Sequence, residues 1–231
     1  MLQLERQKDL MRLLQMQKSM TVKELCDALY ASPATVRRDL AALEQAGLLQ
    51  RSFGGAMLCE TFPDQQPFAV RSSEQTAQKK KIAAKAASLI HPGETLLLDA
   101  STTTHFLIPH LRDIPDLTVI TNSPRACLTL AEAGVRCLCT GGEMLASSMA
   151  LVGSDAEAFV RKIRAHVCIF SARGICDGEI CDSSKPERDL KIAMLERAER
   201  SILLCDSSKE GRRYPYVIAE LAAIDHHIRE L

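Results

Sequence analysis

Two adjacent arginines, Arg37 and Arg38, stand near the start of a short segment with helical character. Ser32 precedes this segment as a helix-capping residue, and Pro33 occupies the first helical position, where its missing N–H has no helical partner to lose. A second amphipathic segment, Thr21 to Leu29, ends a few residues earlier. Two short helices joined by a tight turn, with hydroxyls and arginines near the start of the second, are typical of a helix-turn-helix DNA-binding unit.

The second helix of this pair is expected to enter the major groove of duplex DNA. Arg37 and Arg38 are the candidates for contacts to bases or phosphates, and Ser32 and Thr35 are the candidates for positioning phosphates. Neighbouring residues point about 100° apart on a helix, so we expect one arginine to contact a base while the other holds the backbone. Asp39 is expected to orient an arginine. The alternative for Arg38 is an ion pair with a carboxylate of its own helix.

Polar residues also follow five short apolar segments further along the chain, where they could bind an anion. Hydroxyls beside a helix start suit a phosphate, because free backbone N–H groups point at it, and glycines let the backbone approach a ligand closely. Each residue taken alone is also an ordinary helix cap. Together they predict a pocket for a small hydroxylated anion, with a phosphosugar as the natural candidate. The predicted ligand-binding residues are Asp99, Ser101, Thr102, Thr103, Asn122, Gly141, Gly142, Arg173, Gly174, Asp182, Lys191 and Lys209.

Two of these residues have specific expected roles. Lys209 would neutralise a phosphate as a point charge, and Asp99 would accept hydrogen bonds from sugar hydroxyls. An enzymatic alternative uses the same region, with a carboxylate such as Glu187 as general base and a lysine as anion clamp. No histidine falls in these segments and no nucleophile–base pair is evident, which favours binding over catalysis.

The elements that must position the arginines follow from the pattern of the first part of the chain. Residues 4–15 show helical periodicity. Thr21 and Glu24 have the spacing of a capping box, which predicts a helix start there. Gly47 is expected to end the arginine-bearing helix.

A hairpin and a linker are predicted next. Residues 48–58 contain two short β-like runs around Gly54 and Gly55, which predicts a wing, and Arg51 in this wing is expected to reach an adjacent groove. We therefore expect a winged helix-turn-helix domain over residues 1–58. Residues 59–73 carry two prolines and no clear period, and they are interpreted as a linker.

Residues 74–231 alternate between short apolar runs and amphipathic segments. Such alternation predicts an α/β domain with a mainly parallel sheet, which binds ligands at the carboxyl ends of its strands. The lysine run 79–81 is interpreted as a solvated helix face. The expected strands are 95–99, 117–121, 135–139, 167–171 and 201–205, and the expected helices are 103–111, 124–133, 155–162 and 187–199.

The composition limits the classes of partner. The 231 residues carry 29 basic and 29 acidic side chains, so the chain is not coated with positive charge. A local DNA-binding module remains compatible with this balance, because phosphate attraction acts over about 8–10 Å. There is no tryptophan and only 4% of the residues are aromatic, which argues against a base-stacking surface for single strands.

Neither a membrane partner nor a cofactor is expected. No apolar run reaches the ~18 residues that span a bilayer, and the first residues do not resemble a secretory signal, so a cytoplasmic location is expected. Nine cysteines in a chain without an export signal are interpreted as reduced thiols. Their spacing does not match that of a zinc site.

Taken together, these residues resemble the DeoR family of bacterial transcription regulators. Two departures are Ala100, where the family often has glycine, and the end at Leu231, where family members usually continue for another strand or helix. From these we expect a narrower approach to phosphate and an exposed sheet edge. The resemblance lies in Thr21–Leu29, Ser32–Leu40, Leu43–Gly47, Arg51–Ala56, Arg71, Lys81–Ala83, Gly93, Leu98–Thr103, Thr121–Ser123, Gly141–Gly142, Val152–Gly153 and Leu204–Lys209.

The resemblance implies a repressor of sugar-metabolism genes that a phosphorylated intermediate releases from its operator. It also implies a sensor fold related to ribose-5-phosphate isomerase, without catalysis. Operators with two half-sites about 34–36 Å apart suit symmetric pairs, so a homo-oligomer assembled through the sensor domain is expected. Two alternatives remain open: a sugar-phosphate isomerase with an added DNA-binding module, and a protein-interaction module whose winged helix contacts protein.

Overall fold

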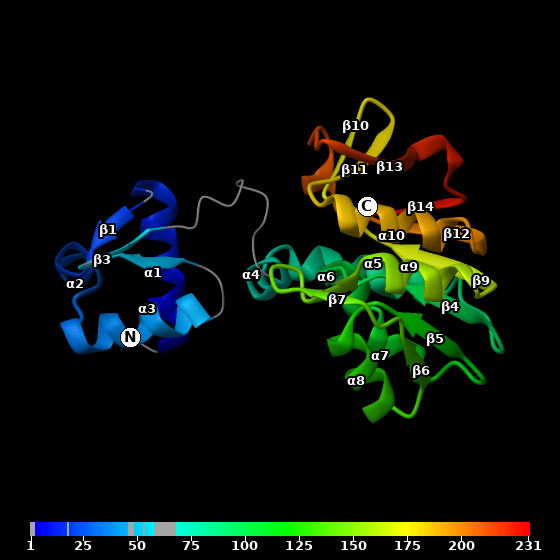
Figure 1. The fold of residues 1–231 in the computed structure, drawn as a ribbon, viewed down its shortest axis with the longest axis horizontal. Coiled ribbons are helices and arrows are strands. Elements are labelled where there is room, and N and C mark those ends of the chain that lie inside the picture. Colours follow the sequence, from blue (N-terminus) through cyan, green and yellow to red (C-terminus); the bar gives the residue numbers. More distant parts are fainter. Residues whose placement is uncertain (1–2, 18, 46–48, 53, 58–67) are drawn as a thin grey trace. The chain divides into compact units, whose positions relative to one another are not determined.

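A computed structural model of the chain describes residues 3–17, 19–45, 49–52, 54–57 and 68–231 (Figure 1). The chain divides into two units, Met1–Pro67 and Phe68–Leu231. Each unit has its own hydrophobic core. In the described ranges, no helix is long and apolar enough to cross a membrane.

The described residues of the first unit form three helices and a small antiparallel sheet of order β1-β3-β2. The strand β1, which the sequence pattern did not predict, pairs with the wing and places Met20 in the core. Leu10, Leu25 and Val36 bring one residue from each helix into that core. The elements are α1 (Gln3–Gln17), β1 (Ser19–Thr21), α2 (Val22–Leu29), α3 (Pro33–Gln45), β2 (Gln50–Ser52) and β3 (Gly55–Met57).

Local hydrogen bonds set the ends of α2 and α3 as predicted. The Thr21 hydroxyl accepts from the Glu24 N–H at 3.2 Å, and the Glu24 carboxylate accepts from the Thr21 N–H at 2.7 Å, which completes the capping box. Tyr30 ends α2 in the left-handed conformation at φ 48°. Ser32 then caps α3 by accepting from the Thr35 N–H at 3.2 Å. Gly47 lies outside the described residues.

The second unit is built on a six-stranded sheet of order β14-β12-β9-β4-β5-β6 in which every neighbouring pair is parallel. The predicted α/β architecture is therefore confirmed. Five of its strands coincide with the predicted ones, and β14 is an addition. The strands are β4 (Thr95–Leu98), β5 (Thr118–Thr121), β6 (Arg136–Cys139), β9 (Ala165–Phe170), β12 (Ala198–Leu204) and β14 (His226–Ile228).

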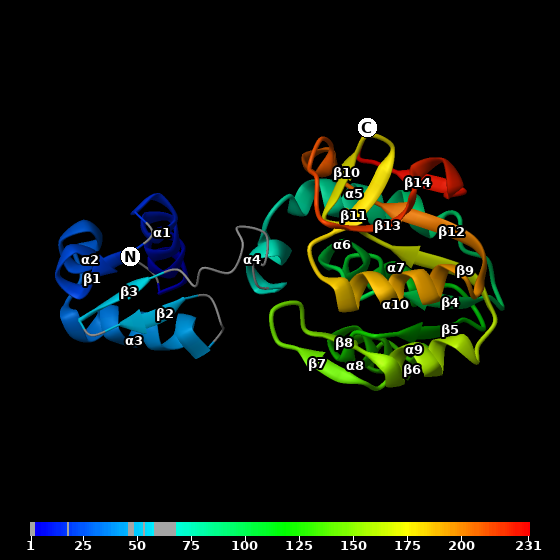
Figure 2. The same cartoon turned by 45° about the horizontal axis from the view of Figure 1, so that its top comes forward.

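Helices cover both faces of this sheet (Figure 2). Alternate strand residues such as Leu96 and Leu97 face opposite cores, because successive side chains point to opposite sides of a strand. One core packs against α5, α7 and α8, and the other packs against α9 and α10. The helices are α5 (Thr76–Ala87), α6 (Thr102–His105), α7 (Ile108–Leu111), α8 (Pro124–Glu132), α9 (Ser154–Arg161) and α10 (Lys185–Leu195).

Several smaller elements were not predicted. A hairpin and a three-stranded antiparallel sheet of order β10-β11-β13 border the main sheet. The last six residues of the predicted linker form the helix α4 (Phe68–Ser73), which belongs to the second unit because Phe68 is buried there. The other elements are β7 (Glu143–Leu145), β8 (Ala150–Val152), β10 (Gly174–Cys176), β11 (Glu179–Asp182), β13 (Tyr216–Glu220) and the 3₁₀ turns η1 (Ser207–Lys209) and η2 (Leu221–Ala223).

The order of the strands determines where a ligand can bind. From β4 the chain adds β5 and β6 on one side, and then β9, β12 and β14 on the other. The direction of winding therefore reverses between β4 and β9. In open parallel sheets, the crevice outside the strand ends at such a reversal is the usual ligand site.

Candidate DNA-binding helix and anion pocket

The two arginines of α3 are exposed, as a role in DNA contact requires. Asp39, on the same helix, turns the other way and is buried. Its carboxylate accepts from Arg6 Nε of α1 at 2.5 Å and from Gln7 Nε2 at 3.3 Å. The expectation that Asp39 orients an arginine holds for Arg6. Among the described ion pairs of α3, none involves Arg37 or Arg38, so the alternative of an intrahelical pair for Arg38 is not observed.

The hydroxyls and the wing arginine also have defined positions. The Ser32 and Thr35 hydroxyl oxygens lie 2.9 Å apart at the start of α3. Glu44, near the end of α3, accepts from the Arg51 N–H at 3.0 Å, and its carboxylate lies 3.8 Å from the Arg51 guanidinium. These contacts connect the wing to the helix. The Arg51 side chain is still 44% exposed.

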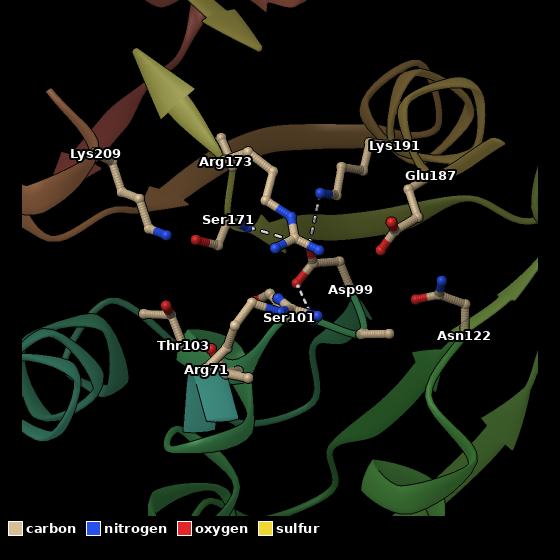
Figure 3. Close-up of a pocket in the computed structure, with 13 residues that line it drawn as sticks. Arg71, Asp99, Ser101, Thr103, Asn122, Ser171, Arg173, Glu187, Lys191 and Lys209 are labelled. Carbon is tan, nitrogen blue, oxygen red and sulfur yellow. Dashed lines mark hydrogen bonds and ion pairs between the residues drawn. The ribbon is translucent and has the colours of Figure 1, made fainter. Parts of the chain in front are cut away.

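A polar pocket of about 470 Å³, which includes space open to solvent, lies at the β4–β9 reversal (Figure 3). It combines eight of the twelve predicted ligand-binding residues, which come from the ends of β4, β5 and β9, from α6, from α10 and from η1. Five further residues line the pocket but were not predicted as ligand-binding residues, although Glu187 was considered as a general base. The predicted members are Asp99, Ser101, Thr102, Thr103, Asn122, Arg173, Lys191 and Lys209, and the additional ones are Arg71, Ala100, Ser171, Ala172 and Glu187.

Four predicted residues do not line this pocket. Gly141 and Gly142 follow β6, which is the edge strand and is separated from β4 by β5. An added Cβ at Gly142 would lie 2.5 Å from the Val152 carbonyl oxygen, so this glycine serves close backbone packing. An added Cβ at Gly174 would overlap the Arg212 carbonyl oxygen in the same way.

The fourth, Asp182, lies beneath the pocket in a buried ion network. Lys191 Nζ is 2.6 Å from the Asp182 carboxylate and 3.5 Å from that of Asp99. Burial opposes the charge of Lys191, but attraction from Asp182 and then Asp99 outweighs it and raises the pKa of this lysine. Burial likewise opposes the charge of Asp182, and its pKa is nevertheless lowered by Lys191 and Arg173. The positive charge of Lys191 is therefore compensated by the two carboxylates of this network.

Asp99 also shapes the strand ends around it. One of its oxygens accepts from the Ser101 N–H at 3.1 Å, and the other accepts from the Ser171 N–H at 3.2 Å. These bonds connect the end of β4 to the end of β9 across the reversal. Asp99 thus holds the strand ends of the pocket together, and its predicted role as an acceptor of sugar hydroxyls stays a prediction.

Three other cations face the cavity from different elements: Arg71 from α4, Arg173 after β9 and Lys209 from η1. Burial and then the neighbouring Arg173 lower the pKa of Arg71 to about 10. Burial also lowers the pKa of Lys209, although Asp206 attracts it. Burial therefore disfavours the charges of Arg71 and Lys209, and Arg173 adds repulsion to both.

Lys79 adds to this positive cluster from behind, which corrects the interpretation of 79–81 as a wholly solvated face. Its side chain is buried, whereas Lys80 and Lys81 are exposed. The ammonium donates to the carbonyl oxygens of Arg71 and, at 2.8 Å, of Glu74. Burial and then repulsion from Lys209 lower the pKa of Lys79 to about 8.

The opposite side of the pocket carries hydrogen-bond acceptors (Figure 3). Asn122 donates through Nδ2 to the Leu151 carbonyl oxygen at 3.0 Å, and its Oδ1 is buried without a hydrogen-bond partner among the described residues. The Glu187 carboxylate lies on the same side, and no ion pair involves it in the described part of the chain. The pocket is therefore polarised, with cations at one side and acceptors at the other.

Comparison with known proteins assigns both units to one family. A profile of the DeoR-like helix-turn-helix domain matches residues 6–62, and a profile of the DeoR C terminal sensor domain matches residues 74–230. The chain belongs to the DeoR family. It is therefore a transcriptional regulator by family, as the resemblance implied.

Individual relatives of this DeoR-family chain agree. An uncharacterized HTH-type transcriptional regulator, YulB, from Bacillus subtilis is 34% identical over 100% of this chain and 90% of its own length. A putative aga operon transcriptional repressor from Escherichia coli O157:H7 is 32% identical over 96% of this chain and 84% of its own length.

Solved structures resemble the fold at low sequence identity. The eIF2B delta structure from Chaetomium thermophilum has a TM-score of 0.53 and 16% identity over 71% of this chain and 59% of that chain. Ribose 5-phosphate isomerase A from Methanocaldococcus jannaschii has a TM-score of 0.42 and 15% identity over 57% of this chain and 53% of that chain. The first of these likenesses supports the α/β fold and carries no statement about ligands.

Ala100 and the cysteines complete the description of this DeoR-family site. Ala100 lines the pocket and is almost fully buried, and the narrower approach to phosphate expected from its methyl group stays a prediction. The eight cysteines in the described ranges are free thiols, and Cys59 lies outside those ranges. Within the described residues, no group of three or more His, Cys, Asp or Glu side chains is arranged to hold a metal ion.

Proposed function

We propose that this chain is a DNA-binding repressor of sugar-metabolism genes and that a phosphorylated sugar or polyol controls it by binding in the sensor pocket. The observation that carries the proposal is the polarity of the pocket. Arg71, Arg173 and Lys209 face the cavity together on one side, and Glu187 and Asn122 face it on the other. A phosphate ester of a polyhydroxylated molecule has the matching distribution of an anion and hydroxyls.

The cationic side is suited to a phosphate because three cations from different elements line the same cavity. Lys191 is neutralised by two carboxylates, but burial and mutual repulsion disfavour the charges of Arg71 and Lys209. A bound phosphate would form charge-assisted hydrogen bonds with them, which are stronger than neutral ones. The free Oδ1 of Asn122 and the Glu187 carboxylate would accept from the hydroxyls of the ligand.

The DNA-binding side of the proposal assigns α3 to the major groove. The exposed Arg37 and Arg38 would contact bases or phosphates, while Ser32 and Thr35 would position the backbone at the start of the helix. We further propose a homodimer, since two copies fit two half-sites about 34–36 Å apart. Repression is favoured because a relative is named as an operon repressor. We also propose that the chain acts in the cytoplasm, where it would contact its operator DNA.

A paired ligand screen tests the proposal. Thermal unfolding of the full chain is followed with phosphorylated sugars and polyols, each beside its unphosphorylated parent. We expect stabilisation by at least one phosphate ester and none by its parent. Lys209→Gln should weaken the binding of that ester, whereas Lys162→Gln, at the exposed end of α9, should leave its affinity unchanged. Equal effects of ester and parent, or an unchanged affinity in the Lys209 variant, would contradict the assignment of the pocket.

The isomerase alternative is favoured by one observation, the Glu187 carboxylate beside the buried Asp99–Lys191 pair. A carboxylate in that position could act as a general base on a sugar phosphate. We propose binding without turnover as the function. Measurable isomerisation of D-ribose 5-phosphate or of a hexose phosphate by the wild type, and its loss in Glu187→Gln, would establish the enzyme instead.

A further inference from the structure

The short helix α4 is fastened to the sensor unit at its first residue. The buried Phe68 ring packs edge-on against His105, with 5.9 Å between the ring centroids. The Arg125 guanidinium lies 5.1 Å from the centroid of the same ring, and the Phe68 N–H donates to the Ser147 carbonyl oxygen at 3.0 Å. The start of α4 therefore has a defined docking site on the sensor unit.

The other end of α4 is held by a lysine of α5. The buried Lys79 ammonium donates to the carbonyl oxygens of Arg71 and Glu74, which lie at the end of α4 and just after it. A helix end leaves such carbonyls without intrahelical donors, so this ammonium acts as a cap. Between these two anchors, Arg71 is the residue through which α4 lines the pocket (Figure 3).

The docked position of α4 places the Arg71 charge close to other cations. Burial and Arg173 lower the pKa of Arg71, and attraction from Glu187 and Asp182 offsets this only in part. An anion among these side chains would stabilise the charge of Arg71 in the docked position. A ligand shifts an equilibrium by its difference in affinity for the two states, and an undocked Arg71 could not contact it.

We propose that an anion bound by Arg71 stabilises the docked α4, and that α4 couples the occupancy of the sensor pocket to the segment that leads to the DNA-binding unit. The proposal rests on the proposed function, since it requires an anionic ligand in this pocket. In sequence, α4 begins directly after residues 58–67, which connect it to the wing. Undocking of α4 would add its six residues to that connection.

The added length is large enough to matter for DNA binding. Six residues of extended chain span up to about 20 Å. This is more than half of the ~34–36 Å between the half-sites of an operator. In a homodimer, docked α4 helices would thus restrict the separations that two DNA-binding units can reach.

Hydrogen exchange on the full-length wild type tests the proposal, with inorganic phosphate as the probe. The Kd of phosphate is first measured by calorimetry, and exchange is then compared without phosphate and at about ten times that Kd. The amides of Phe68 and Glu74 report on α4, because Phe68 N–H donates to the Ser147 carbonyl oxygen of the docking site and Glu74 N–H donates to the Val70 carbonyl oxygen of the helix. If opening of α4 requires release of the anion, their exchange slows about tenfold.

Two variants separate coupling from binding. Arg71→Gln should still bind phosphate through Arg173 and Lys209, but at ten times its own Kd the exchange of α4 should not slow. Lys209→Gln removes a pocket cation on η1 and leaves α4 intact. At about ten times its own Kd it should show the same tenfold slowing as the wild type. Thermal unfolding confirms that both variants are folded.

The outcomes are distinguishable. Phosphate that binds the wild type without slowing exchange in α4 overturns the inference and leaves the proposed function in place. The same conclusion follows if Arg71→Gln shows full slowing at saturation. If neither phosphate nor any phosphate ester of the screen binds, both proposals fail. The wild-type comparison remains decisive if Arg71→Gln does not fold.

Discussion

Asp182→Asn should destabilise the sensor unit strongly, because it removes one charge of a buried pair. Lys191 Nζ lies 2.6 Å from the Asp182 carboxylate, and the two side chains are only 10% and 1% exposed. After the substitution, Lys191 keeps one carboxylate partner, Asp99, at 3.5 Å. Breaking a buried pair by removing one partner costs about 3–5 kcal/mol, because the remaining charge is left poorly compensated.

The chain offers a control pair at the surface with the same distance between the charged atoms. Lys185 Nζ also lies 2.6 Å from a carboxylate, that of Asp189, but these side chains are 60% and 24% exposed. Solvent screens such a pair, so Lys185→Gln should cost no more than about 0.5 kcal/mol. The two substitutions therefore compare burial at a constant distance between charged atoms.

Thermal unfolding of the full chain at pH 7 measures the difference. In a domain of this size, 1 kcal/mol shifts Tm by about 2–4 °C. The transition of the sensor unit should therefore fall by about 6–12 °C or more in Asp182→Asn and by at most about 2 °C in Lys185→Gln. Equal shifts in the two variants would show that burial does not set the energy of the Asp182–Lys191 pair.

Three further predictions address other parts of the chain. Arg37→Ala and Arg38→Ala should each weaken operator binding by about 1–3 kcal/mol in fluorescence titrations, while Arg12→Ala, at an exposed position of α1, should not. Burial lowers the pKa of Lys79 to about 8, below its value in the unfolded chain, so the unfolded chain holds this proton more tightly and raising the pH from 7 to 9 should stabilise the wild type by about 1 kcal/mol relative to Lys79→Met. A pH dependence that matches in both proteins would contradict that burial. Gly174→Ala should destabilise the sensor unit by about 1–3 kcal/mol in chemical unfolding, because its Cβ would overlap the Arg212 carbonyl; a neutral effect would mean that the backbone can separate there.

The sequence was informative wherever a local pattern determines the structure. Short apolar runs followed by amphipathic segments predicted five strands of the parallel sheet. Four of these runs are buried on both faces of the sheet, and the fifth, β6, is an edge strand. The Thr21–Glu24 spacing and the Ser32–Pro33 pair predicted two helix starts for reasons of capping alone. The β10-β11-β13 sheet escaped prediction because its strands are short and partly polar, and because β13 pairs with β11 from a distant part of the chain.

Pocket residues were predicted only as far as strand ends identify them. Gly141 and Gly142 follow a strand end like the others, but the strand order places β6 at the edge, and that order is a property of the whole sheet. Arg71 was missed because it stands in a segment without periodicity that was interpreted as linker. Its position depends on Phe68 finding a site beside His105 and Arg125, which are distant in sequence.

Lys191 and Lys209 show why residue type alone could not assign roles inside the pocket. Both are lysines that line the same cavity, yet their electrostatic surroundings are opposite. Lys191 has two carboxylates within 3.5 Å, and one of them, on β11, reaches it because an antiparallel sheet that the sequence did not reveal forms beside α10. Lys209 lies on the same side of the cavity as Arg173, and burial disfavours its charge. A ligand anion therefore gains most from Lys209 and its arginine neighbours, because Lys191 already has its counterions.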